Sequence, residues 1–268
     1  MTAIPLVARS VFKESVRDKV LYNLVFFAVL LIGASYLISQ LTAGQDVKII
    51  KDFGLAAASL FGLFIAVFIG IGLVWKEVER RSIYSLLAKP LRRTEFVLGK
   101  YLGLLLTLAI NLSVMAAALY AVLAVMAWNS EPLARAAWEA PALDPALLTA
   151  FLLMFAQLAL ITAVALFFST FSTPLLSAAL TFGLFVIGHF NADLKNFEAV
   201  VESPVAAGAA RVLYYLLPNL APFDVKAQIV HGQAVGAGYV LMTLGYAVLY
   251  IAALLVAASI VFERRDFK

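Results

Sequence analysis

Six long runs of residues without Asp, Glu, Lys or Arg constrain this sequence more than any other feature. They are Leu21–Leu41, Phe53–Trp75, Tyr101–Trp128, Leu147–Ser169, Pro174–Phe190 and Tyr239–Phe262. About 20 apolar residues in helical form cross a bilayer, and a charge at its centre costs several kcal/mol. The runs are apolar throughout, whereas the strands of a membrane barrel alternate apolar and polar residues. The sequence therefore predicts an all-α integral membrane protein with six transmembrane helices, forming a single domain over residues 1–268.

The composition supports this class. Hydrophobic residues make up 64% of the chain and charged residues 13%, whereas a soluble domain has about half apolar and a quarter charged residues. This excludes a soluble enzyme, a disordered chain and a free nucleic-acid binder. The net charge of +4 is explained by basic residues at the cytoplasmic face, so no nucleic-acid partner is needed. There is no cysteine, which excludes disulfides and thiolate metal sites.

The basic residues also predict the orientation. The N-terminal tail, the connection between spans two and three and the C-terminus together hold 14 of the 20 Lys and Arg residues. The excess on that side places both termini in the cytoplasm by the positive-inside rule, as an even number of spans requires. We expect a multi-pass membrane protein with both termini on the cytoplasmic side.

Residues 1–20 have the pattern of an amphipathic helix. Ile4, Val7 and Val11 fall on one arc, and Arg9 and Lys13 lie opposite. This spacing predicts a helix in the cytoplasmic interface before the first span. The alternative is a solvated basic tail, which would need no apolar face.

The connection over residues 76–100 is the most informative part of the sequence. It reads KEVERRSIYSLLAKPLRRTEFVLGK. Ile83, Leu86 and Leu87 repeat at helical spacing, and Lys89-Pro90 ends the pattern because a residue before proline avoids the helical region. The positive-inside rule alone would explain the basic residues of this connection. It would not explain a short helix that carries both acidic and basic residues and ends at a proline. A short helix parallel to the membrane, suited to docking a cytoplasmic partner, is the prediction.

Residues 191–238 form a long external connection. Within it, Leu213, Leu216, Leu217 and Leu220 share a helical face. A short amphipathic helix at the outer interface is expected, dipping back toward the membrane. This segment could act as a gate that handles the substrate, or it could simply fill space against the bundle. The sequence favours neither role over the other.

The second span carries a stripe of small residues. Every fourth position is occupied by glycine or alanine, namely Gly54, Ala58, Gly62, Ala66 and Gly70. Small residues at this spacing let another helix approach closely, inside the subunit or in a dimer. Close packing is favoured over a pore wall.

The sequence holds no catalytic or nucleotide-binding motif. Gly99-Lys100 lacks the glycine and the Ser or Thr of a phosphate-binding loop. His189 and His231, the only histidines, are both expected at external membrane edges, so neither a metal site nor a His-based triad is expected. Spans without acids or bases also argue against proton or sodium coupling. We expect no enzyme and no cofactor in this chain, and any uphill transport must draw its energy from elsewhere.

A resemblance to a known family rests on the 76–100 connection. The E-x-E-R-R turn leaving span two, the short helix, K-P-x-x-R and E-F-x-x-G-K entering span three resemble the ABC-2 type permeases, the membrane subunits of ATP-binding-cassette transporters. The resemblance covers essentially the whole chain. It is similar in particular to the branch that contains the permease of the nitrous-oxide-reductase copper-maturation transporter.

The resemblance implies that Glu77–Pro90 is a coupling helix, seated in a groove of a separate ATPase subunit. The positions expected to couple to the ATPase are Glu77, Glu79, Arg80, Arg81, Ser82, Ile83, Leu86, Leu87, Lys89, Pro90, Arg92 and Arg93, and Glu95, Gly99 and Lys100 also match the family pattern. Two ATPases would bind ATP and Mg, and two permease subunits, as a homodimer in the lipid bilayer, would form one pathway.

Two functions from different classes remain open from the sequence. The first is the permease of an ATP-driven exporter. The second is a membrane scaffold that anchors a cytoplasmic protein without transport. A passive channel is poorly supported, because no ring of polar or charged residues can be named. The uncharged spans favour a lipid-like or amphipathic cargo over a small ion.

Overall fold

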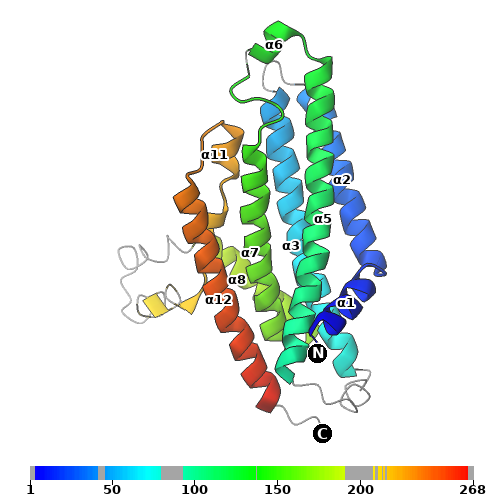
Figure 1. Ribbon diagram of the computed structural model, residues 1–268, viewed down its shortest axis with the longest axis vertical. Helices are drawn as coiled ribbons and strands as arrows, with labels where there is room; N and C mark the ends of the chain where they lie inside the picture. Colours follow the sequence, from blue (N-terminus) through cyan, green and yellow to red (C-terminus); the bar gives the residue numbers. More distant parts are fainter. Residues whose placement is uncertain are drawn as a thin grey trace.

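The computed structural model describes residues 4–41, 46–79, 93–136 and 138–190, together with residues 208, 211, 212, 214 and 216–264. In chain order the elements are α1 (Ile4–Ser15), α2 (Lys19–Ser39), α3 (Asp46–Glu79), α5 (Arg93–Asn129), α6 (Pro132–Ala136), α7 (Ala146–Ser169), α8 (Pro174–His189), the 3₁₀ turn η2 (Ala221–Phe223), α11 (Lys226–Val230) and α12 (Ala237–Arg264) (Figure 1). All the regular structure of these residues is helical, which confirms the predicted fold class.

Five of the described helices, α2, α3, α5, α7 and α12, are long and apolar enough to cross a membrane. They match five of the predicted spans within a few residues, except that α3 and α5 begin seven or eight residues before the predicted apolar runs. The remaining predicted span, Pro174–Phe190, corresponds to α8, which has only 16 residues. At 1.5 Å per residue it rises about 24 Å, less than the roughly 30 Å hydrocarbon core. The fifth predicted span is therefore a short helix.

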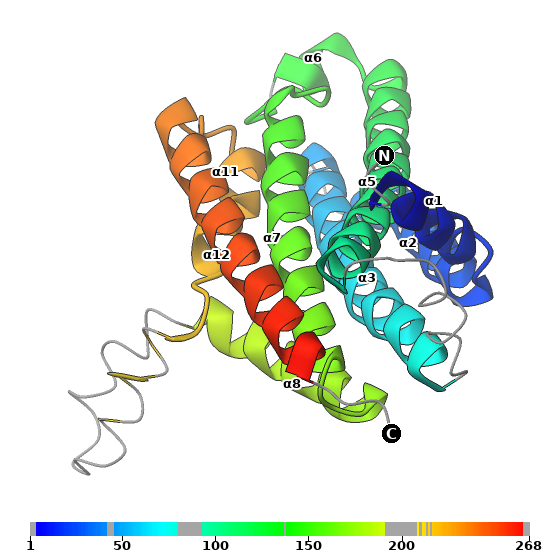
Figure 2. The same cartoon turned by 60° about the horizontal axis from the view of Figure 1, so that its bottom comes forward.

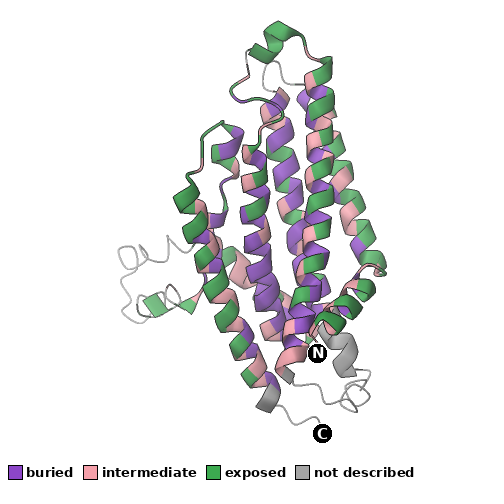
Figure 3. Cartoon of the chain, viewed as in Figure 1, coloured by how far each residue is buried: buried purple, intermediate pink, exposed green. Residues whose placement is uncertain are grey.

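Helix α7 is at the centre of the bundle. Seventeen of its 24 residues are buried, and it contacts α3, α5, α8 and α12. By contrast, α2 lies at one edge against α3 and α5, and α12 lies at another against α7 and α5 (Figures 1 and 2). These two edge helices bury one face only, as the colouring in Figure 3 shows. The apolar stripe that points inward, and not the overall hydropathy, distinguishes edge helices from the central one.

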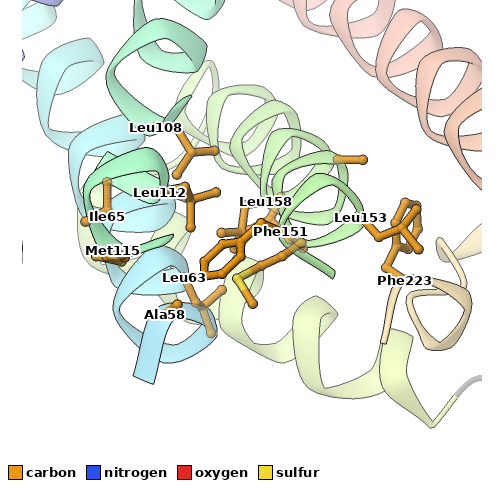
Figure 4. Packing of buried hydrophobic residues seen from close by; sticks show 14 of the residues in the cluster. Ala58, Leu63, Ile65, Leu108, Leu112, Met115, Phe151, Leu153, Leu158 and Phe223 are labelled. Carbon is orange, nitrogen blue, oxygen red and sulfur yellow. The ribbon is translucent and has the colours of Figure 1, made fainter. Parts of the chain in front are cut away.

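The core joins three long helices. Leu63 of α3, Leu112 of α5 and Leu158 of α7 meet in its middle, and Phe223 of η2 lies against the opposite face of α7 beside Leu153 (Figure 4). All five side chains are at most 5% exposed. Close packing of this kind, rather than exclusion from water, holds helices together in a bilayer.

Polar side chains within the spans mostly bond to their own helix. Ser35 donates to the carbonyl of Ile32 at 2.6 Å, Ser113 to that of Ala109 at 2.7 Å, and the Asn111 amide to that of Thr107 at 2.7 Å. In hydrocarbon each polar group must find a partner within the protein. These groups are thereby satisfied locally.

Candidate functional site

The predicted ATPase-coupling residues connect the end of α3 to the start of α5. Glu77 and Glu79 are in the last turn of α3, and Arg93 is the first residue of α5. The remaining predicted coupling residues lie outside the described residues: Arg80, Arg81, Ser82, Ile83, Leu86, Leu87, Lys89, Pro90 and Arg92. The structure therefore positions the two helices that flank the loop, and the coupling helix itself remains a prediction.

Both flanking helices continue past their apolar spans. The apolar run of α3 ends at Trp75 while the helix runs to Glu79, which adds about 6 Å. Helix α5 begins eight residues before the predicted span at Tyr101, which adds about 12 Å. The loop is thus joined to two continuous helices that run through the whole bundle.

Helix α1 packs against the first turns of α5. A Cβ atom built on Gly99 would lie 2.6 Å from Val7 Cβ, and one on Gly103 would lie 2.6 Å from the carbonyl oxygen of Ala8. The two glycines are four residues apart on one face, the spacing that permits close helix contact. The predicted apolar arc of α1 is therefore real, and α5 covers its central part, since Val11 is 4% exposed.

Aromatic rings connect the start of α5 to the end of α12. Phe96 stacks on Phe262 with the ring centroids 6.0 Å apart and an interplanar angle of 19°. The ammonium of Lys100, a buried residue, lies 4.9 Å from the centroid of the Phe96 ring, within the range of a cation–π contact. This end of the bundle thus joins α1, α5 and α12 beside the 80–92 loop.

The small-residue stripe of α3 faces other helices of the same chain. A Cβ on Gly54 would meet Leu119 of α5, and one on Gly62 would meet Leu158 of α7. At Gly70 the nearest atom is the Ala165 Cβ, at 3.5 Å. Ala58 and Ala66, the intervening members, are at most 4% exposed. The stripe lies within the subunit, where it brings α3 close to α5 and α7.

Residues Leu216–Val230, here called the returning segment, fold back against the bundle. Leu220, Phe223 and Ile229 are at most 2% exposed, and α11 contacts α3 and α7. The helical residues of the predicted amphipathic helix extend only to Leu216, since Pro218 stops it, and Leu220 lies beyond it, directly before η2. Leu213 lies outside the described residues.

Backbone hydrogen bonds hold the returning segment. The Leu220 amide donates to the carbonyl of Gly188 at 2.8 Å, near the end of α8. The hydroxyl of Tyr239 donates to the Pro222 carbonyl at 2.7 Å, and the Tyr246 hydroxyl accepts from the Asn219 amide at 2.8 Å. A third tyrosine, Tyr250, donates to the carbonyl of Leu216. The α12 tyrosines therefore bind the backbone of residues 216–222, where Pro218 and Pro222 prevent a continuous α-helix.

Alanine at position 188 is expected to displace the returning segment. Its Cβ would lie 2.9 Å from the Pro218 carbonyl oxygen and 2.8 Å from Leu220 Cγ, and such overpacking costs about 1–3 kcal/mol. Hydrogen exchange should accelerate at residues 219–223 in Gly188→Ala. The control is Gly183→Ala on the same helix, where nothing lies within 4 Å of the added Cβ. Equal exchange in both variants would contradict the assigned packing.

The polar side chains near the returning segment do not form a catalytic set. Nε2 of His189 lies 2.9 Å from the Gln157 side-chain nitrogen, and its Nδ1 lies 2.8 Å from the Phe185 carbonyl oxygen. His231 contacts Glu139 at 3.0 Å on the surface. Among the residues that the structure describes, no three His, Cys, Asp or Glu side chains form a group that could hold a metal ion.

Sequence reasoning missed Gly103, Phe96, Phe262 and the tyrosines of α12 as structural contacts. The spacing of Gly99 and Gly103 was a usable signal, because it is the pattern of close helix packing. The aromatic residues carry no such signal, since aromatic residues are also common at membrane interfaces.

The apolar helices, centred on a fully packed α7, define a multi-pass integral membrane protein. A family model described as ABC-2 family transporter protein matches residues 6–267, and the chain belongs to this family. It is therefore a permease subunit of an ABC transporter, a transport component without its own ATPase domain that works with a cytoplasmic ATPase. The match does not distinguish the branch of the family. No curated protein matches the chain.

Proposed function

We propose that the chain is the permease of an ATP-driven exporter and that its ATPase docks on the loop between α3 and α5. The observation that carries the proposal is the continuity of these two helices, of 34 and 37 residues, from the loop through the bundle. A rigid helix transmits a displacement at its end along its whole length, which is how rigid-body transport transitions are driven.

The packing around the loop supports the same proposal. Helix α1 and the Phe96–Phe262 stack hold the first turns of α5, and the small-residue stripe holds α3 against α5 and α7. A movement of the loop would therefore displace α3, α5 and α7 together. ATP and Mg would be bound by the ATPase, with the cytoplasmic loop and both termini on the same side of the bacterial inner membrane.

A homodimer of permeases with two ATPases is the assembly we propose. Helix α7 is buried on nearly all sides by its own chain, so the centre of one subunit is filled by side chains. A pathway would then run between two copies and not through one. The edge helix α2 offers large apolar side chains for such a contact, among them Phe26 and Leu30, which are 61% and 48% exposed.

Reversal of two charges in the loop tests the docking. In Arg80→Glu/Arg81→Glu we expect the ATPase to be lost on purification from the native membrane in mild detergent. Juxtaposed like charges cost several kcal/mol, and about 3 kcal/mol weakens binding roughly 100-fold. The measurement is the ratio of ATPase to permease, together with ATP hydrolysis by the purified complex.

The matched control reverses two charges on the exposed face of α1, as Arg9→Glu/Lys13→Glu, and should retain the ATPase. A measurement of ATP-dependent cargo export in vesicles distinguishes an exporter permease from a membrane scaffold. A protein that binds its partner through this loop but supports no ATP-dependent export would be a scaffold. Retention of the ATPase in the loop variant would refute docking at this site.

A further inference from the structure

An apolar groove opens on the side of the bundle between α5 and α12, with α7 as its floor. Its volume is about 730 Å³. The floor is buried, with Ala156 and Ala159 of α7 at 6% and 4% exposure, while the rim residues Val248 and Val256 of α12 are 65% and 60% exposed. The groove is therefore hollowed by small side chains and open at its side. The Phe96–Phe262 stack lies beside it near the ends of α5 and α12.

The groove is lined almost entirely by aliphatic and aromatic side chains. The hydroxyl of Tyr101 donates to the Ala159 carbonyl at 3.2 Å, and that of Ser259 donates to the Leu255 carbonyl at 2.8 Å. Two of the three hydroxyl groups of the lining are thus turned to the backbone, and the third belongs to Thr94, where the lining stretch of α5 begins. A hydrophilic ligand would lose its hydrogen bonds to water here and gain few in return.

The length and volume of the groove indicate which apolar molecule could fit in it. The lining residues of α5 run from Thr94 to Leu105, which is about 17 Å at 1.5 Å per residue. One leaflet of a bilayer core is about 15 Å deep, half of roughly 30 Å. Along the same 17 Å, a helix of 10 Å diameter would occupy about 1,300 Å³, nearly twice the volume of the groove. The groove therefore suits a lipid chain better than a helix.

The neighbouring face of α5 is already occupied. Gly99 and Gly103 contact α1, whereas Leu98 and Leu105 line the groove. Because all the lining residues except Thr94 and Leu98 lie within the predicted apolar runs, the medium outside most of the rim is lipid. We propose that this groove binds an acyl chain of a bilayer phospholipid, held between α5 and α12 as a resident of the subunit.

Filling the groove tests this. The permease is purified with its native partners, stripped of lipid by detergent washing, and incubated with palmitoyl-oleoyl phosphatidylethanolamine before native mass spectrometry. We expect the wild-type chain to retain one lipid. In Ala252→Trp, which puts an indole into the groove, the retained fraction should fall at least about tenfold. The matched control is Ala253→Trp, the next residue of α12, which is exposed and does not line the groove.

A second pair of variants keeps the test valid if Ala252→Trp fails to fold. Val248→Trp closes the rim, and Leu249→Trp, at 75% exposure outside the groove, is its control. Loss of lipid in both groove variants and in neither control supports the proposal. Equal lipid retention in groove and control variants would overturn it, as would a wild-type chain that holds no lipid. A change of permease copy number confined to the groove variants would also overturn it, because the groove would then be an interface between copies.

Discussion

Replacing Asp144 with asparagine is expected to destabilise the protein by about 3 kcal/mol, the low end of the cost of breaking a buried ion pair by removing one partner, because the Asp144 side chain is itself 13% exposed. The Lys51 side chain is fully buried in α3, and its ammonium lies 3.7 Å from Asp144 Oδ2. Its closest acceptor is the carbonyl of Pro141, at 2.9 Å. Without the carboxylate, the buried ammonium keeps one neutral acceptor and no counter-charge. Unfolding of the purified protein by SDS titration measures the difference.

Two further variants separate the contributions of this pair. Asp144 also accepts a hydrogen bond from the Ala146 amide at the start of α7, at 2.9 Å, so Asp144→Ala should cost about 1 kcal/mol more than Asp144→Asn. The double variant Lys51→Met/Asp144→Asn should recover most of the stability, since replacing both ionic partners by less polar groups is often neutral. If Asp144→Asn alone has wild-type stability, the buried Lys51 ammonium does not need the Asp144 carboxylate as a counter-charge, and the prediction is wrong.

Leucine in place of Gly103 is expected to separate α1 from α5. Even a Cβ at this position would lie 2.6 Å from the Ala8 carbonyl oxygen and 2.7 Å from Val11 Cβ, and neither is the flexible tip of a side chain. Backbone must therefore move, and we expect a loss of about 2–3 kcal/mol, at the upper end of the cost of overpacking.

Spin labels can follow this separation directly, because the chain has no cysteine and two can be introduced at chosen sites. Ser10 and Leu106 are exposed positions on α1 and α5. The distance between labels there should be sharply distributed in the wild-type chain and broad in Gly103→Leu. Gly245→Leu is the control, since nothing lies within 4 Å of a Cβ on this α12 residue. An unchanged distribution in Gly103→Leu would show that the contact between α1 and α5 is not required.

The predicted ends of most membrane-spanning helices lie close to the observed ends, because helix formation depends on residues that are near one another in the sequence. At α7 the run Leu147–Ser169 differs from the helix by one residue, because a backbone without water must form its hydrogen bonds within one segment. The amphipathic α1 followed equally from the positions of Val7, Val11 and Arg9. At the coupling loop the family resemblance was upheld by the family match, while the roles of Arg80 and Arg81 remain predictions.

The contacts of Lys51 and of the returning segment could not be predicted in this way. Lys51 precedes the predicted second span, which begins at Phe53, and its burial depends on a carboxylate 93 positions later in the chain. Leu220 was expected on an interfacial helix, but it is fully buried directly before η2, with its amide bonded to the Gly188 carbonyl. Both outcomes depend on partners that are distant in the sequence.

The sequence by itself determined where the membrane-spanning helices lie and to which family the chain is similar. Tertiary structure alone decided that α7 is central, that α8 ends against Leu220, that Gly103 faces α1, and that an open groove lies beside Ala156. The physical reason is that lipid and protein interior are equally apolar, so hydropathy does not distinguish a residue that faces a neighbouring helix from one that faces the bilayer. That distinction arises only when the helices pack and small residues meet large ones.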